Sequence, residues 1–143
     1  MTFLQRLCLL LAITSLIGCV TPPPPPRPDE TLTQKEVNVA SALKFESSRE
    51  EALLAVAKRT DLAATDQVYL IDVIYQRLTV EESKMNLLKN LIHNPAFTNA
   101  AKAAILDGLT ENLKFDNDRQ QILRLLQERG PIDDMDVSGT TRP

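Results

Sequence analysis

The stretch LKFESSR, residues 43–49, returns as LTVEESK at residues 78–84 and as LKFDNDR at residues 113–119, a spacing of 35 residues each time. The first and third copies continue to match beyond this stretch. Their identical residues, with their partners 70 positions on, are Leu43, Lys44, Phe45, Arg49, Leu53 and Arg59. A repeat of this length with helical spacing of apolar residues indicates a stack of two-helix units.

An apolar pair follows each copy of the stretch, and a second apolar position comes one helical turn later. The pairs are Ala52-Leu53, Leu87-Leu88 and Ile122-Leu123. Residues spaced in this way form one stripe along a helix. Leu53, Leu88 and Leu123 are therefore expected at equivalent buried sites.

The pattern as a whole predicts an all-α fold of about six short antiparallel helices, either a small α-solenoid or a bundle. No segment alternates with period two between turn signals, so no strands are expected. The expected helices span residues 33–43, 47–60, 65–77, 82–94, 98–111 and 117–129.

Capping residues mark where these helices begin and end. Ser47 with Glu50 has the spacing of a capping box, and Phe45 occupies the position of a hydrophobic staple. Threonine caps are expected for three other helices, at Thr33 (with Glu36), Thr65 and Thr98. Asn94-Pro95 and Gly130-Pro131 are expected to end the helices before them.

The chain begins with a different kind of segment. An apolar run from Leu7 to Ile17 follows Arg6, and the sequence Leu16-Ile17-Gly18-Cys19 closes it. The run is shorter than the ~20 residues that cross a bilayer, which favours a secretory signal over a transmembrane anchor. An ordinary signal peptide that happens to contain a cysteine is the other alternative.

Leu16-Ile17-Gly18-Cys19 resembles the lipobox of bacterial lipoproteins. The resemblance implies cleavage between Gly18 and Cys19, and diacylglycerol and a fatty acid such as palmitate attached to Cys19. Cys8 would leave with the signal peptide. Val20 rather than aspartate follows the cysteine, which resembles an outer-membrane sorting signal.

Four segments are expected: a signal peptide (1–18), the lipidated cysteine with a tether (19–30), a helical-repeat domain (31–130) and an acidic, disordered tail (131–143). The run Pro22–Pro26 favours polyproline II, so the tether would reach roughly 30 Å. Such a segment is also a known kind of ligand for aromatic grooves. The signature L-x-F-[DE]-x-x-[RK] resembles an uncharacterised helical-repeat domain of bacterial secreted proteins, although Val80 departs from its aromatic position.

The residues that carry chemistry in enzymes are sparse. His93 is the only histidine, and a zinc site would have to rest on carboxylates. Glu81-Glu82 lies at a helix start and Asp133-Asp134 in the tail, where neither pair would be buried. The serines lack a nucleophile motif, the four glycines are scattered, and no basic cluster indicates nucleic-acid binding. We therefore expect no catalytic residue, no metal site and no cofactor.

Arg49, Lys84 and Arg119 share one repeat position, three residues after an acid in each copy. This spacing predicts intrahelical ion pairs worth a few tenths of a kcal/mol. The alternative is a row of cations that binds an anionic partner. Tyr69 and Tyr75 lie six residues apart, so at most one is expected in the core, and the other could contact a partner.

These features lead to the expectation of a lipoprotein in a bacterial envelope, anchored through Cys19 to the outer membrane and facing the periplasm. It would act as a protein-binding or envelope-assembly module, of which a pilotin-like role is one example. The alternative is a structural or cell-wall-associated lipoprotein. The expected partners are the membrane and another envelope protein, with no nucleic acid and no small-molecule substrate.

Overall fold

Residues 30–130 are described by the structure, a computed structural model, and they form six α-helices without a strand. The prediction of an all-α fold with six helices is confirmed. The helices are α1 (Leu32–Ser41), α2 (Glu46–Ala57), α3 (Ala64–Arg77), α4 (Glu81–His93), α5 (Asn99–Asn112) and α6 (Asp116–Glu128).

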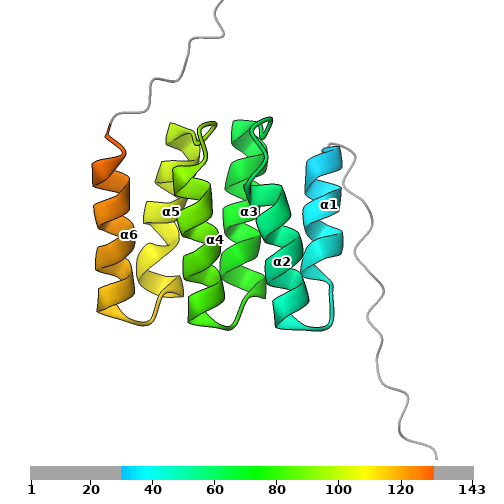
Figure 1. The fold of residues 1–143 in the computed structure, drawn as a ribbon, viewed down its shortest axis with the longest axis horizontal. Coiled ribbons are helices and arrows are strands. Elements are labelled where there is room, and N and C mark those ends of the chain that lie inside the picture. The colour runs from blue at the N-terminus through cyan, green and yellow to red at the C-terminus, as the bar shows by residue number, and fades with distance from the viewer. Residues whose placement is uncertain (1–29, 131–143) are drawn as a thin grey trace, which may run out of the picture.

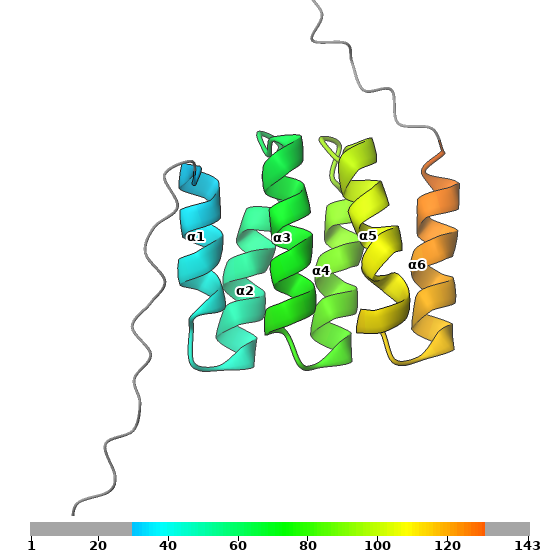
Figure 2. The same cartoon turned by 180° about the vertical axis from the view of Figure 1, so that it is seen from behind.

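The helices form two layers, with α1, α3 and α5 in one and α2, α4 and α6 in the other (Figures 1 and 2). Within each layer every helix packs on the one that precedes it. Because consecutive helices are antiparallel, three helical hairpins stack side by side, as in a short α-solenoid. The α1–α2, α3–α4 and α5–α6 loops lie along one edge, the lower edge in Figure 1, and the described chain begins and ends at the opposite, upper edge.

One repeat position forms the centre of the core. Leu53 on α2 and Leu88 on α4 are both 0% exposed, as predicted. The prediction was wrong for Leu123 on α6, which is 37% exposed, while its neighbour Ile122 is 0% exposed. Among the described residues no further hairpin follows α6 to cover Leu123.

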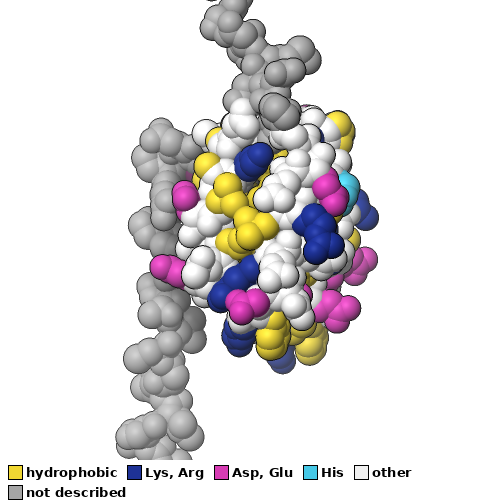
Figure 3. Space-filling view, turned by 90° about the vertical axis from the view of Figure 1, so that its left-hand side faces the viewer, with side chains coloured by type: hydrophobic (Ala, Val, Ile, Leu, Met, Phe, Trp, Pro, Cys, Tyr) yellow, Lys and Arg dark blue, Asp and Glu magenta, His cyan; other side chains and the backbone are white. Residues whose placement is uncertain are grey.

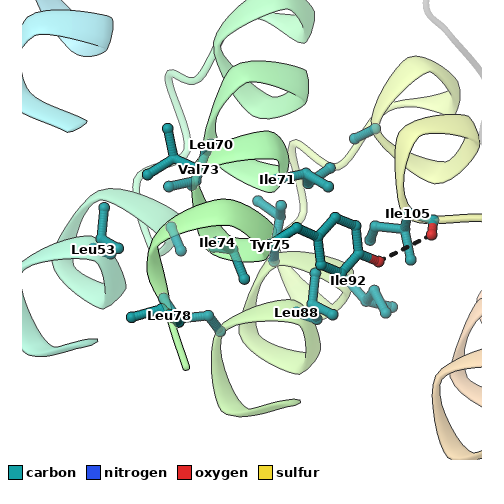
Figure 4. Close-up of a cluster of buried hydrophobic side chains, with 14 of the residues drawn as sticks. Leu53, Leu70, Ile71, Val73, Ile74, Tyr75, Leu78, Leu88, Ile92 and Ile105 are labelled. Carbon is teal, nitrogen blue, oxygen red and sulfur yellow. Dashed lines mark hydrogen bonds between the residues drawn. The ribbon is translucent and has the colours of Figure 1, made fainter. Parts of the chain in front are cut away.

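Tyr75 joins two neighbouring hairpins. Its side chain runs from α3 to α5, where the hydroxyl donates a hydrogen bond to the carbonyl oxygen of Ile105 at 3.0 Å (Figure 4). Gly108 makes room for the ring, because a Cβ atom at this position would lie 2.4 Å from Tyr75 Cε2. Burial raises the pKa of Tyr75. Tyr69 is only partly buried and donates to Asn38 Oδ1 at 2.6 Å, so one tyrosine lies in the core, as expected.

Helix starts agree with the expected caps only in part. Thr98 caps α5 by accepting from the N–H of Ala101 at 3.2 Å, as predicted. The cap of α1 is Thr31 rather than Thr33. The Thr31 hydroxyl also donates to Asp66 on α3 at 2.7 Å, and this long-range bond fixes the start of α1 two residues early.

Two other cap predictions were wrong. Helix α3 begins after Ala63, so Thr65 lies inside its first turn and caps nothing. Helix α2 begins after Phe45, which places Ser47 inside the helix and leaves Phe45 itself at the N-cap with 65% exposure. Neither the capping box nor the hydrophobic staple is therefore formed.

Helix ends agree with the sequence. Asn94 is the C-cap of α4, directly before Pro95. Gly130 follows the last helix with φ of 73°, a left-handed conformation that glycine adopts without strain.

Leucine truncation tests the layered core. Leu53→Ala or Leu88→Ala is expected to lower the free energy of unfolding by about 2–5 kcal/mol, because each change leaves a cavity between hairpins. Leu123→Ala is the matched control and should cost under about 1 kcal/mol, since its side chain is already partly in water. Urea unfolding measures all three, and a loss at Leu123 equal to that at Leu88 would contradict this packing.

Candidate functional site

The lower edge exposes an apolar side chain at the same repeat position of each hairpin. Phe45, Val80 and Phe115 occupy the same repeat position and are 65%, 47% and 60% exposed. We call these three residues the apolar ladder. Lys44 and Lys114 precede the two phenylalanines, and the Lys44 ammonium lies 5.7 Å from the centre of the Phe45 ring. Figure 3 shows apolar and basic side chains together at the lower end of the molecule.

Each residue of the apolar ladder is the N-cap of its helix, and none supplies a side-chain hydrogen bond there. Ser, Thr, Asp or Asn at an N-cap stabilises a helix by typically about 1 kcal/mol over an apolar residue. The same chain uses threonine caps at Thr31 and Thr98. Three exposed apolar residues at capping positions thus reduce stability without adding to the core, which is typical of residues that contact a partner.

The loops that present the ladder are held by the predicted acid–cation pairs. Arg49 binds Glu46 at 2.9 Å and donates a second hydrogen bond to the carbonyl oxygen of Leu43 at 3.0 Å. Arg119 does the same for the last loop, with a hydrogen bond to the carbonyl oxygen of Leu113 at 2.7 Å. These cations therefore fix loop conformation, a role beyond the surface pairing that the sequence indicated.

The second hairpin varies this arrangement. Lys84 lies 4.0 Å from Glu81, and its ammonium donates to the carbonyl oxygen of Asn112, the last residue of α5, at 2.9 Å. Lys84 is only 6% exposed. The cations at this repeat position therefore do not form a row that is free to bind an anionic partner, because they already donate hydrogen bonds to backbone carbonyl oxygens.

The acids of the pairs also reach the next hairpin. Glu46 accepts hydrogen bonds from the N–H groups of Thr79 and Val80 at 2.8 and 2.7 Å, and from the Thr79 hydroxyl at 2.7 Å. Glu81 accepts from the N–H of Lys114 at 2.6 Å. Each acid thus fastens the following loop, which sets the spacing of the apolar ladder.

This bonding changes the acidity of Glu46. Burial raises the pKa of the carboxyl group, but the hydrogen bonds from Val80, Thr79 and Arg49 outweigh it and lower the pKa from 4.5 to about 2. The equivalent residue of the last hairpin, Asp116, has an 83% exposed side chain. No loop follows it among residues 30–130.

The upper edge repeats its bonds with the same register. Asn94 donates to the carbonyl oxygens of Ala57 and Arg59, both at 2.7 Å. Arg129, 35 residues on, donates to the carbonyl oxygens of Ile92 and of Asn94, the latter at 2.7 Å. Both side chains therefore bind the end of the helix one hairpin back.

Two open hollows lie on the layer of even-numbered helices, with volumes of about 220 and 230 Å³. They are equivalent by the repeat. The first is lined by Ile92, His93, Leu125, Glu128 and Arg129, and the second by Lys58, Asn90, His93, Asn94 and Pro95. Neither lining brings together a nucleophile and a base.

His93 lies at the end of α4, as expected, and its Nδ1 is 2.6 Å from the carbonyl oxygen of Lys89. Among residues 30–130, no three His, Cys, Asp or Glu side chains are grouped as metal ligands would be. Sequence reasoning missed the apolar ladder. The pattern that would have predicted it is an apolar residue directly before the acid that starts a helix, repeated in all three copies.

Comparisons with protein-family models, with curated proteins and with solved structures find no match to this chain. Within the described part of the chain, no helix has the length and hydropathy that crossing a bilayer requires. Several predicted features lie outside the described residues: the signal peptide, the lipidation site Cys19, the tether except its last residue (30), and the whole acidic tail. The lipoprotein and helical-repeat resemblances stay predictions.

The pH dependence of stability tests the bonds of Glu46. Because its folded pKa lies below its ordinary value, Glu46 stabilises the fold fully above about pH 5, and this contribution is lost as the pH falls through 4.5 toward 2. Glu46→Gln should flatten the loss of stability over that range, as measured by urea midpoints. Asp116→Asn, at the exposed equivalent position, should leave the profile nearly unchanged. Equal profiles for Glu46→Gln and the parent protein would contradict the bonding.

Proposed function

We propose that this protein is a bacterial envelope lipoprotein that binds another envelope protein through its lower edge. The anchor part of the proposal rests on the sequence Leu16-Ile17-Gly18-Cys19, with cleavage before Cys19 and acylation of it. The binding part rests on one observation above all: the apolar ladder, exposed at capping positions where polar residues would make the helices more stable.

The arrangement of the edges supports this division of roles. Both ends of the described chain lie at the upper edge, and the apolar ladder lies at the lower edge (Figure 1). A lipid attached through residues 19–30 would hold the upper edge nearest the membrane. The lower edge would then face the aqueous compartment, where a partner protein has access to it.

The chemistry of the ladder favours a protein partner over an enzymatic substrate. When exposed phenylalanines contact a partner protein, they bury a large apolar area, and the neighbouring lysines can pair with acidic groups at the rim of the interface. Escort or assembly of an envelope component, as in pilotin-like proteins, is consistent with such a surface. A structural lipoprotein bound to cell wall is the alternative, and capture experiments separate the two.

Acyl labelling tests the anchor. The parent protein should incorporate labelled palmitate and fractionate with membranes, because two or three acyl chains contribute about 0.8 kcal/mol per buried methylene. Cys19→Ser should abolish the label and leave uncleaved precursor or soluble protein. Cys8→Ser is the matched control and should behave as the parent. Unchanged labelling of the Cys19→Ser protein would reject the lipoprotein assignment.

Serine at the ladder tests the binding edge, because stability and binding should change in opposite directions. Phe45→Ser and Phe115→Ser each place a good N-cap residue at a helix start, so each should raise the free energy of unfolding by up to about 1 kcal/mol. The double variant should nevertheless lose the partner that crosslinks to the parent protein in intact membranes. His93→Ala, an exposed residue at the end of α4 away from the lower edge, is the control and should retain it.

Retention of the same crosslinked partner by the double variant would contradict the proposed edge. Recovery of peptidoglycan in place of a protein partner would favour the structural alternative. Thermal melts of each purified variant provide the stability measurement.

A further inference from the structure

The α5–α6 end of the stack exposes leucines at positions that are buried elsewhere. Leu123 is 37% exposed, whereas its equivalent Leu88 is 0% exposed. Leu106 is 41% exposed, whereas its equivalent Ile71 is 1% exposed. Figure 3 views this end of the molecule and shows apolar side chains gathered in its middle. The surface that joins one hairpin to the next therefore continues to the outside of the stack.

Other positions on this end have become polar. Gln127 is equivalent to Ile92, which is 2% exposed, and Gln120 is equivalent to Met85, which is 5% exposed. Terminal units of repeat proteins usually make their whole outer face polar. Here Gln120 and Gln127 lie one turn before and one turn after Leu123 on α6, so an apolar position is retained between polar ones, an arrangement typical of a protein interface. We call this surface, with Leu106, Leu123, Gln120 and Gln127, the C-terminal face.

The opposite end of the stack is also apolar. Leu32 and Val39 on α1 are 79% and 71% exposed and lie on the side of the helix away from the buried residues Val37 and Ala40. We call the outer side of α1 and α2, with Leu32 and Val39, the N-terminal face. Both ends of the stack thus leave apolar side chains in water.

The two ends are also complementary in hydrogen bonding. The acids of the first two hairpins bind N–H groups of the next loop, and Asp116, their equivalent in the last hairpin, is 83% exposed. The equivalent N–H groups of the first loop belong to Lys44 and Phe45. Neither donates to another described residue. The Asp116 carboxylate at one end and the N–H groups of Lys44 and Phe45 at the other are equivalent to the acceptors and donors that form hydrogen bonds between neighbouring hairpins within the chain.

We propose that this protein associates head to tail with second copies of itself, the C-terminal face of one copy packing on the N-terminal face of the next. A second copy is the expected partner because this contact would continue the internal one. The outer side of α1 and α2 is equivalent to the side of α3–α4 that packs on the first hairpin, and to the side of α5–α6 that packs on the second. A contact between two different faces is heterologous: it closes into a ring if the rotation between copies allows this, and otherwise continues as an open row. In such a row every copy has its chain ends along one edge (Figure 1). The proposal does not depend on the lipid anchor or on the partner of the apolar ladder.

Two differently tagged full-length copies, produced together and extracted in mild detergent, test the contact by capture of one tag and detection of the other. The parent pair should co-purify. A pair in which both copies carry Leu123→Glu, and a pair in which both carry Val39→Glu, should each lose co-purification, because a carboxylate would be buried in the contact. Phe115→Glu in both copies is the control and should co-purify as the parent does.

A mixed pair decides the geometry. One copy with Leu123→Glu and one with Val39→Glu still hold one intact face of each kind between them, so head-to-tail packing predicts that co-purification returns. If the Val39→Glu pair co-purifies alone, the contact joins two C-terminal faces and the proposal is wrong. A parent pair that does not co-purify, or a mixed pair that fails while all copies retain parental circular dichroism, overturns it as well.

Discussion

Contact between equivalent positions of neighbouring hairpins is the constraint on which the rest of this structure depends. A pair of short helices cannot bury both of its faces alone, and Leu53 and Leu88 become inaccessible only because another hairpin packs beside them. The polar bonds follow the same register. Glu46 accepts a hydrogen bond from the N–H of Val80 in the next loop, and Asn94 donates one to the end of α2. The same shift from one hairpin to the next therefore buries the apolar side chains and pairs the backbone groups.

Much of this fold could be predicted because burial leaves a period in the sequence. The apolar pairs recur every 35 residues, so the number, order and approximate bounds of the helices followed from the pattern alone. Helix starts were harder to predict, because they depend on bonds between distant residues. The Thr31 hydroxyl donates a hydrogen bond to Asp66 on α3. Glu46, which follows Phe45, accepts one from the N–H of Thr79 in the next loop. No local rule for capping contains those partners.

Two features could not be read from the pattern, each for a physical reason. Leu123 has the sequence context of Leu88, but its burial depends on whether another hairpin follows, which the residues around it do not encode. Phe45 and Phe115 were recognised as part of the repeat, and Phe45 was assigned to a hydrophobic staple, because the repeat alone does not distinguish a buried position from an exposed one. Their exposure at helix N-caps makes them the centre of the candidate binding edge.

The protection of backbone amides against hydrogen exchange tests most directly that neighbouring hairpins stabilise one another. In dilute protein, amides of α3 and α4, which have hairpins on both sides, should exchange most slowly. Those of α1 and α6, each with a neighbour on one side only, should exchange faster. The comparison of α4 around Leu88 with α6 around Leu123 is the sharpest, because the two segments are equivalent in sequence pattern. Equal protection of these two segments in monomeric protein would contradict the account.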